Sequence, residues 1–125
     1  MNNNFHTDRP DYDINSFEIT NTGDTGLFKP ANGKLILIYN IEIFGYCEKA
    51  STDTPFVFEI LIKKNGKWRI LCGVKAIEKK DFLLSFKYPN SLRTDRGDGA
   101  SQVLRARVSG DKDFDINISI ISNKF

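Results

Sequence analysis

Apolar and polar residues alternate with a period of two along most of this chain, and this pattern limits the folds that it can adopt. Alternation places successive side chains on opposite faces of a β-strand, with one face buried. No segment shows a convincing helical stripe, and the only candidate, "KAIEKKDFL", is short. The pattern predicts strands at 16–20, 34–48, 56–63, 67–77, 81–88, 102–109 and 113–121, with a short one near 25–29.

The segments between these strands have the composition of turns. They include "NTGDTG", "PANG", "ASTDTP" and "SGDKD", in which glycine, proline, asparagine and aspartate predominate. Seven or eight short strands in one small chain predict a sandwich, a jelly roll or a barrel.

The chain has 125 residues, enough for one domain with a substantial core. Residues 1–14 are polar and predict a flexible N-terminal arm, which leaves 15–125 as the folded domain. The polar start of the sequence predicts no signal peptide, and the sequence contains no run of about 18 apolar residues. The net charge of +2 gives no reason to expect nucleic acid or an anionic membrane as a partner. Cys47 and Cys72 are predicted to be reduced, buried thiols.

Asn65-Gly66 marks a hairpin turn between two apolar runs. Asn-Gly most often forms a two-residue type I′ turn, but that register would mix charged and apolar side chains on both faces. A three-residue loop, 64–66, pairs Ile62 with Trp68 and makes one face wholly apolar. Burial of one large apolar side chain is worth roughly 1.5–3 kcal/mol, so we expect the three-residue loop, with Trp68 turned inward.

The segment 34–48 is apolar on both of its faces. A sheet with one solvated face would not need this pattern, so something must cover both sides. A covering loop, such as the arm, would satisfy it. A contact between subunits would too, and the extent of the apolar surface favours the contact. The residues predicted for this oligomer interface are Ile36, Ile38, Phe44, Tyr46 and Phe125.

The stretch "TGLFKPANGKLILIYNIEI", followed by "FVFEILIKKNGKW", resembles the tumour necrosis factor-like jelly roll in its complement globular-head version. That family tends to show Gly-x-Phe-x-Pro, then a glycine that opens a long strand, and later Asn-Gly at a hairpin. A Gly-Asp before a penultimate strand is also typical of it. The matching residues here are Gly26, Phe28, Pro30, Gly33, Lys64–Gly66 and Gly97–Asp98.

The resemblance implies an all-β, two-sheet antiparallel jelly-roll sandwich over roughly residues 16–125, usually assembled as a homotrimer. The sheet that lies against the threefold axis of such trimers contains the long strand and the last strand. Family members are non-enzymatic recognition heads, cytokines, spore-surface proteins and phage fibre or decoration domains. We therefore expect neither a cofactor nor a metal ion.

Few residues suggest catalysis. The single histidine, His6, lies in the predicted arm, so a nucleophile in the domain would lack a base. Asp111, Asp113 and Asp115 alternate and could bind a hard cation, but the glycine and glutamate of a helix–loop–helix calcium loop are missing. We interpret them as a solubilising strand entry.

The segment 89–101 is predicted to be a long, exposed loop, and recognition residues tend to lie in such loops. It contains Arg-Gly-Asp at 96–98, a tripeptide that integrin ligands display but that is common by chance. The candidates for partner contact are Arg93, Asp95, Arg96 and Asp98.

These observations favour a virion structural or adhesion protein, a trimeric jelly roll that decorates a bacteriophage capsid or forms a fibre head after assembly in the host cytoplasm. The arm could dock onto a capsid or fibre protein, and the head could bind a cell-surface glycan. The alternative is a carbohydrate-binding β-sandwich module, for which Tyr39, Tyr46 and Trp68 are the available aromatic residues. A small barrel that binds single-stranded nucleic acid through Trp68 and its neighbouring lysines is a third class.

Overall fold

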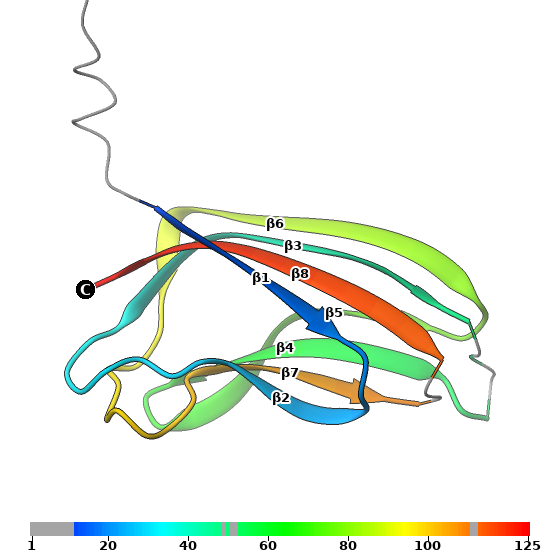
Figure 1. Cartoon of the computed structure of the whole chain (residues 1–125), viewed down its shortest axis with the longest axis horizontal. Helices are drawn as coiled ribbons and strands as arrows, with labels where there is room; N and C mark the ends of the chain where they lie inside the picture. The colour runs from blue at the N-terminus through cyan, green and yellow to red at the C-terminus, as the bar shows by residue number, and fades with distance from the viewer. Residues whose placement is uncertain (1–11, 49, 51–52, 111–112) are drawn as a thin grey trace, which may run out of the picture.

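The computed structural model describes residues 12–48, 50, 53–110 and 113–125, and these residues form an all-β sandwich (Figure 1). Two antiparallel four-stranded sheets pack face to face, which confirms the predicted fold class. The strands are β1 (Asp13–Ile19), β2 (Gly23–Phe28), β3 (Ile36–Cys47), β4 (Phe56–Lys64), β5 (Lys67–Ala76), β6 (Lys80–Arg93), β7 (Leu104–Ser109) and β8 (Phe114–Lys124).

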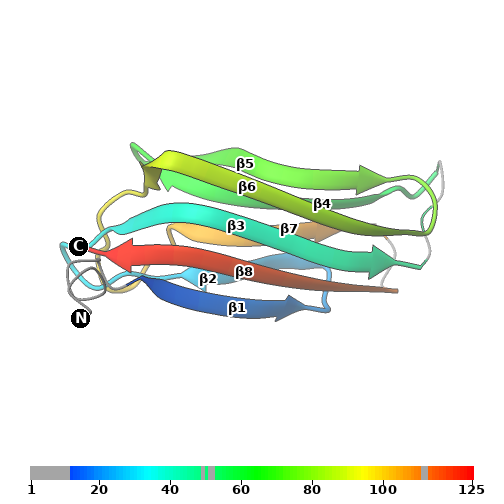
Figure 2. The same cartoon turned by 90° about the horizontal axis from the view of Figure 1, so that it is seen from above.

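The strand order is that of a jelly roll. β1 pairs with β8, β2 with β7, β3 with β6 and β4 with β5, as in one long folded ribbon whose tip is the β4–β5 turn. Pairing of β3 with β8 and of β4 with β7 then closes the ribbon into two sheets. The strand order is β1-β8-β3-β6 in one sheet, which we call the first sheet, and β2-β7-β4-β5 in the other, which we call the second sheet (Figure 2).

Every predicted strand is present, but several boundaries differ, most of all at the start of β1 and the end of β6. Asp13 and Ile14, which we assigned to the arm, already belong to β1 and pair with Ser122 and Ile121. The rest of the arm, 1–11, lies outside the described residues. β6 continues to Arg93, through residues that we assigned to a loop. It accommodates Pro89, which has no N–H to donate, because the ladder with β3 is interrupted there and Ser91 has a φ of 58°.

The β4–β5 connection is a two-residue turn, so the three-residue loop that we predicted is wrong. Lys64 pairs with Lys67, and both Asn65 (φ 55°) and Gly66 (φ 77°) have the positive φ of a type I′ turn. A β-bulge at Leu71 brings apolar residues of the two strands opposite each other beyond the turn: Ile60 pairs with Cys72 and Phe58 with Val74, two residues further along β5 than the longer loop would place them. The bulge therefore removes the conflict between turn chemistry and burial.

A carboxylate from another part of the chain holds this turn. The backbone N–H groups of Asn65 and Gly66 donate to the two oxygens of Asp95, over 2.6 and 2.8 Å. Charge-assisted bonds of this kind are stronger than neutral ones. Asp95 thus ties the tip of the β4–β5 hairpin to the segment that follows β6.

An extra residue in β3 reverses the direction of its side chains. Ile38 pairs with Ser122 of β8, but the next paired position is Asn40 with Ile121, so Tyr39 is a bulge. Ile36 and Ile38 before the bulge, and Ile41 and Ile43 after it, all point into the core and are 0% exposed. The prediction that Ile36 and Ile38 lie on the outer face is therefore wrong, because we assumed unbroken alternation through Tyr39.

The core lies between the two sheets and is almost entirely aliphatic and aromatic. Phe56 packs against Phe82 and Phe114, with ring centroids 6.2 and 5.3 Å away, and joins the two sheets at one end. Cys47 and Cys72 are buried free thiols, as predicted. Burial raises the pKa of Cys72 to about 12, so this thiol stays protonated and is a poor nucleophile. The largest fully buried side chains are Phe56, Phe58, Ile36, Ile38, Ile41, Ile43, Ile60, Leu104, Ile116, Ile118 and Ile120.

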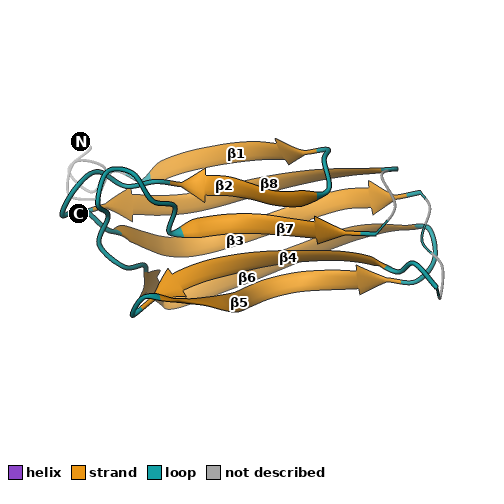
Figure 3. Cartoon of the chain, turned by 90° about the horizontal axis from the view of Figure 1, so that it is seen from below, coloured by secondary structure: helices purple, strands orange, loops and turns teal. Residues whose placement is uncertain are grey.

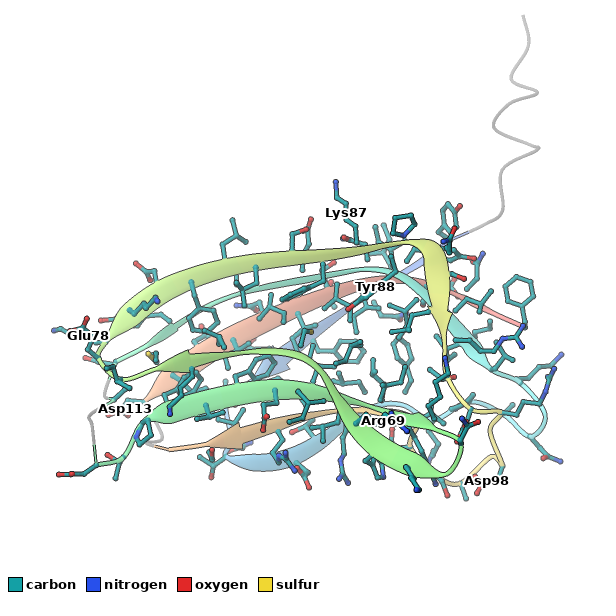
Figure 4. The ribbon with its side chains drawn as sticks, turned by 180° about the vertical axis from the view of Figure 1, so that it is seen from behind. Arg69, Glu78, Lys87, Tyr88, Asp98 and Asp113 are labelled. Atoms are coloured by element: carbon teal, nitrogen blue, oxygen red, sulfur yellow. The ribbon has the colours of Figure 1, made fainter. Side chains whose placement is uncertain are left out.

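The Asp95 contact can be tested by mutation. Asp95→Ala removes both acceptors at the turn, and we expect it to lower the free energy of unfolding by about 1–2 kcal/mol in urea titrations. Glu78→Ala, at an exposed turn at the other end of the sandwich (Figure 4), is the control and should change stability by less than about 0.5 kcal/mol. Equal stability of the two variants would contradict this role of Asp95.

Candidate interaction face

The outer face of the first sheet carries the most exposed apolar cluster that we identify on the sandwich. Phe44 of β3 pairs directly with Leu83 of β6, and the two side chains are 57% and 74% exposed. Tyr46, two residues along β3, is 36% exposed and faces the same way. We call the outward side chains of this sheet around Phe44 the Phe44 face.

Strand register arranges the Phe44 face in rows across the sheet. One row contains Glu18, Asn117, Phe44 and Leu83, in the order β1, β8, β3, β6. The row on one side of it contains Ser16, Ser119, Glu42 and Ser85, and the row on the other side contains Asp115, Tyr46 and Asp81.

The small side chains beside Phe44 leave a shallow trough. It has a volume of about 390 Å³ and runs over Ser16 and Ser119, with Glu42 and Phe44 on its sides. Its lining combines hydroxyl, amide and carboxylate groups with apolar side chains. The trough makes the surface uneven and able to receive a protruding side chain.

The Phe44 face is acidic. Glu18, Glu42, Asp81 and Asp115 are exposed in its three rows, and those rows contain neither lysine nor arginine. Lys87 lies one row further along the sheet and points away from the sandwich, whereas its neighbour Tyr88 lies between the sheets (Figure 4).

Burial raises the pKa of Tyr88 to about 12, with a smaller contribution from Cys72.

The predicted interface residues are thus divided between three places. Phe44 and Tyr46 lie on the Phe44 face, whereas Ile36 and Ile38 are in the core. Phe125 is exposed, but its backbone pairs with Leu35, before β3 begins, so it lies at the far end of the sheet from Phe44. Leu83 is the neighbour that sequence reasoning did not select for this set, although its outward position in β6 follows from alternation.

The four residues that we predicted for partner contact mainly serve the protein's own loops. Asp95 holds the β4–β5 turn, and the Arg96 Nη1 donates to the carbonyl oxygen of Gly33 over 2.8 Å. Asp98 accepts hydrogen bonds from the N–H groups of Ala100 and Ser101. Arg93 is exposed at the end of β6.

The Arg-Gly-Asp tripeptide is docked against the loop that precedes β3. Gly97 is buried, its N–H donates to the Lys34 carbonyl over 2.6 Å, and its carbonyl accepts from Gly33 over 2.9 Å. A side chain at Gly97 would collide with the backbone of Pro30. The tripeptide is therefore not presented at the tip of a free loop.

Trp68 lies on the outer face of the second sheet, so its predicted inward position is wrong. The two-residue turn pairs it with Lys63 instead of Ile62. The Arg105 guanidinium lies 4.2 Å from the centroid of the Trp68 ring and covers one of its faces. The three aromatic residues considered for sugar binding are also separated, because Tyr39 and Tyr46 belong to the other sheet and Tyr39 packs on Tyr12 at 4.9 Å.

The described residues contain no ready-made metal site. Within 12–48, 50, 53–110 and 113–125, no three histidine, cysteine, aspartate or glutamate side chains come together as metal ligands. His6 and Asp111 lie outside these ranges. The same part of the chain contains no helix with the length and apolar character needed to cross a membrane.

Comparisons with known proteins do not assign the chain to a family. The sequence matches no protein-family model, and no curated protein gives a significant match. Function must therefore be argued from the fold and from the surfaces described above.

The Asp98 turn predicts a pH-dependent change in the 98–101 loop. Hydrogen bonds from Ala100 and Ser101 lower the pKa of Asp98 to about 2 from an ordinary value of 3.8. The folded form therefore gains stability from this carboxylate above about pH 4 and loses it progressively as the pH falls toward 2.

The amide chemical shifts of Ala100 and Ser101 in a pH titration should report this change with a midpoint near 2. In Asp98→Asn the same transition should be absent. A midpoint near 4 in the unmodified protein would contradict the proposed hydrogen bonding.

Proposed function

We propose that this protein is a non-enzymatic structural or adhesion module of a virion, a capsid decoration protein or fibre head, and that it acts as a homotrimer joined through the Phe44 face. The observation that carries the proposal is the adjacent, exposed pair formed by Phe44 of the central strand β3 and Leu83 of the edge strand β6. Apolar clusters of this kind on otherwise polar faces mark contact surfaces.

The charge of the Phe44 face favours a cyclic trimer over a twofold dimer. A twofold contact would place the same surface of two copies together, so Glu18, Glu42 and their acidic neighbours would face each other. Like charges at an interface cost free energy. A cyclic assembly instead brings the Phe44 face against a different surface of the next copy, where lysine and arginine can lie opposite the carboxylates.

The resemblance to tumour necrosis factor-like domains supports the same arrangement. In that family the sheet with the long strand and the last strand faces the threefold axis. Here β3 and β8 are the two central strands of the first sheet, which bears the Phe44 face. A virion origin is consistent with this resemblance and with assembly in a host cytoplasm, after which the residues before β1 would contact a capsid or fibre protein.

The carbohydrate-binding alternative receives less support. Sugar-binding sandwiches present several aromatic rings on one surface, but Trp68 lies on the second sheet and is covered by Arg105. Tyr39 is already packed against Tyr12. A glycan bound by the assembled trimer would need another surface.

Light scattering with size exclusion at micromolar concentration tests the assembly. We expect about three times the monomer mass of 14.2 kDa. Phe44→Glu and Leu83→Glu should each raise the dissociation constant at least about tenfold, because each removes roughly 1.5–3 kcal/mol of apolar burial. Both variants should keep the thermal stability of the folded monomer, since the two side chains are exposed.

Ile70→Glu is the matched control. Ile70 is 60% exposed on the outer face of the second sheet, so its substitution changes an apolar side chain outside the Phe44 face. If all three variants dissociate equally, or if the unmodified protein is a monomer at every concentration, the proposed interface is wrong. The virion assignment has a separate test, since genes for capsid or tail proteins should lie beside the coding gene.

A further inference from the structure

A pocket opens at the edge of the sandwich where β1 and β2 run beside each other. These are the edge strands of the two sheets, on the same side of the molecule (Figure 3). The pocket has a volume of about 310 Å³, at the lower end of the range for small-molecule sites. Its lining residues come from β1, β2, the β2–β3 segment, the start of β3 and the end of β8.

The floor of the pocket is formed by apolar side chains that pack against one another. Phe17 of β1 and Phe28 of β2 meet edge to face across the two sheets, with ring centroids 5.8 Å apart. Ile36, which is fully buried, and the ring of Pro30 complete the floor. An apolar body of a ligand could lie against these side chains.

Three lysines surround this floor. Lys29 and Lys34 come from the β2–β3 segment, and Lys124 comes from the end of β8, where it pairs with Ile36. The residues that line the pocket include no aspartate or glutamate, and none of the three lysines forms an ion pair with another described residue. Asp13, two residues before Asn15 on β1, is outside the lining.

A polar group inside the pocket also lacks a partner. The side-chain nitrogen Nδ2 of Asn15 is buried, and it donates no hydrogen bond to any described residue. Leaving a buried amide donor unsatisfied costs about 1–3 kcal/mol, so such a group requires an explanation. A rotation of the Asn15 side chain toward the pocket would expose this nitrogen and let a ligand acceptor supply the missing bond.

We propose that this pocket, lined by Asn15, Phe17, Phe28, Lys29, Lys34 and Lys124, binds a small organic acid: a carboxylate carried on a compact body with one apolar face. The carboxylate lies among the three ammonium groups, and the body rests on Phe17 and Phe28. The Asn15 amide donates to an oxygen of the ligand. The site is on the edge of the sandwich and is a different surface from the Phe44 face.

Two sources of this chemistry are acidic sugars and aromatic or aliphatic acids. Calorimetric or NMR titration of the full chain with N-acetylneuraminate and with phenylacetate separates them. Each has a neutral counterpart, the methyl ester and phenylacetamide, which should bind at least about tenfold more weakly because the charge is lost. Binding of the acid should weaken as salt is raised, since the ammonium groups are exposed to solvent.

Variants locate the site. Lys29→Gln/Lys34→Gln/Lys124→Gln should abolish measurable binding, and Asn15→Leu, which keeps the side-chain size, should weaken it about tenfold. Lys75→Gln/Lys79→Gln/Lys80→Gln makes the same change in net charge at exposed positions at the other end of the sandwich and should bind as the unmodified protein does. Ala31→Trp, which fills the mouth of the pocket without changing a charge, should also block binding.

The proposal is overturned if neither acid binds at concentrations up to about 10 mM, or if the two lysine triple variants bind equally. Equal binding by Asn15→Leu, with loss in the lysine variant, would overturn the assigned role of the amide. The oligomeric state of each variant is measured alongside, so failure of the pocket and failure of the Phe44 interface give different results.

Discussion

The architecture depends on how β3 pairs with β8 at the centre of the first sheet. Ile41 and Ile43 lie opposite Ile120 and Ile118, and these four side chains are buried against the second sheet. The bulge at Tyr39 lets the earlier half of β3 contribute Ile36 to the same core. Because of this one inserted residue, even-numbered positions before Tyr39 and odd-numbered positions after it lie on the same, buried face of the sheet.

The fold class and the approximate strands could be predicted because alternation and turn composition are local properties of the sequence. The register changes could not, since a bulge leaves no clear compositional signal and shifts every later side chain to the other face. For Ile36 and Ile38 the apolar pattern on both faces was therefore interpreted as a subunit contact. The loop length predicted for the β4–β5 hairpin was wrong for the same reason, because the bulge at Leu71 permits the type I′ turn that Asn65 and Gly66 prefer.

The surfaces could be predicted only in part, for a related reason. Phe44 and Tyr46 face outward because they follow the bulge and alternate with Ile43 and Cys47, so sequence periodicity identified them. The lysine pocket combines segments from both ends of the chain, and no local pattern brings Lys29 near Lys124. Asp95 shows the same limit, because its partner turn is about 30 residues away. Long-range pairing of this kind follows from the jelly-roll topology.

The change in side-chain direction at Tyr39 can be measured directly by thiol labelling of single cysteine variants. With Cys47 and Cys72 replaced by alanine, cysteine is placed in turn at Ile36, Ile38, Asn40 and Glu42. In an unbroken strand these four positions share one face and would label at similar rates. The bulge predicts that cysteine at 36 and 38 is protected, whereas cysteine at the exposed position 42, and to a lesser degree at the half-buried position 40, reacts faster. Equal labelling at all four positions would contradict the account.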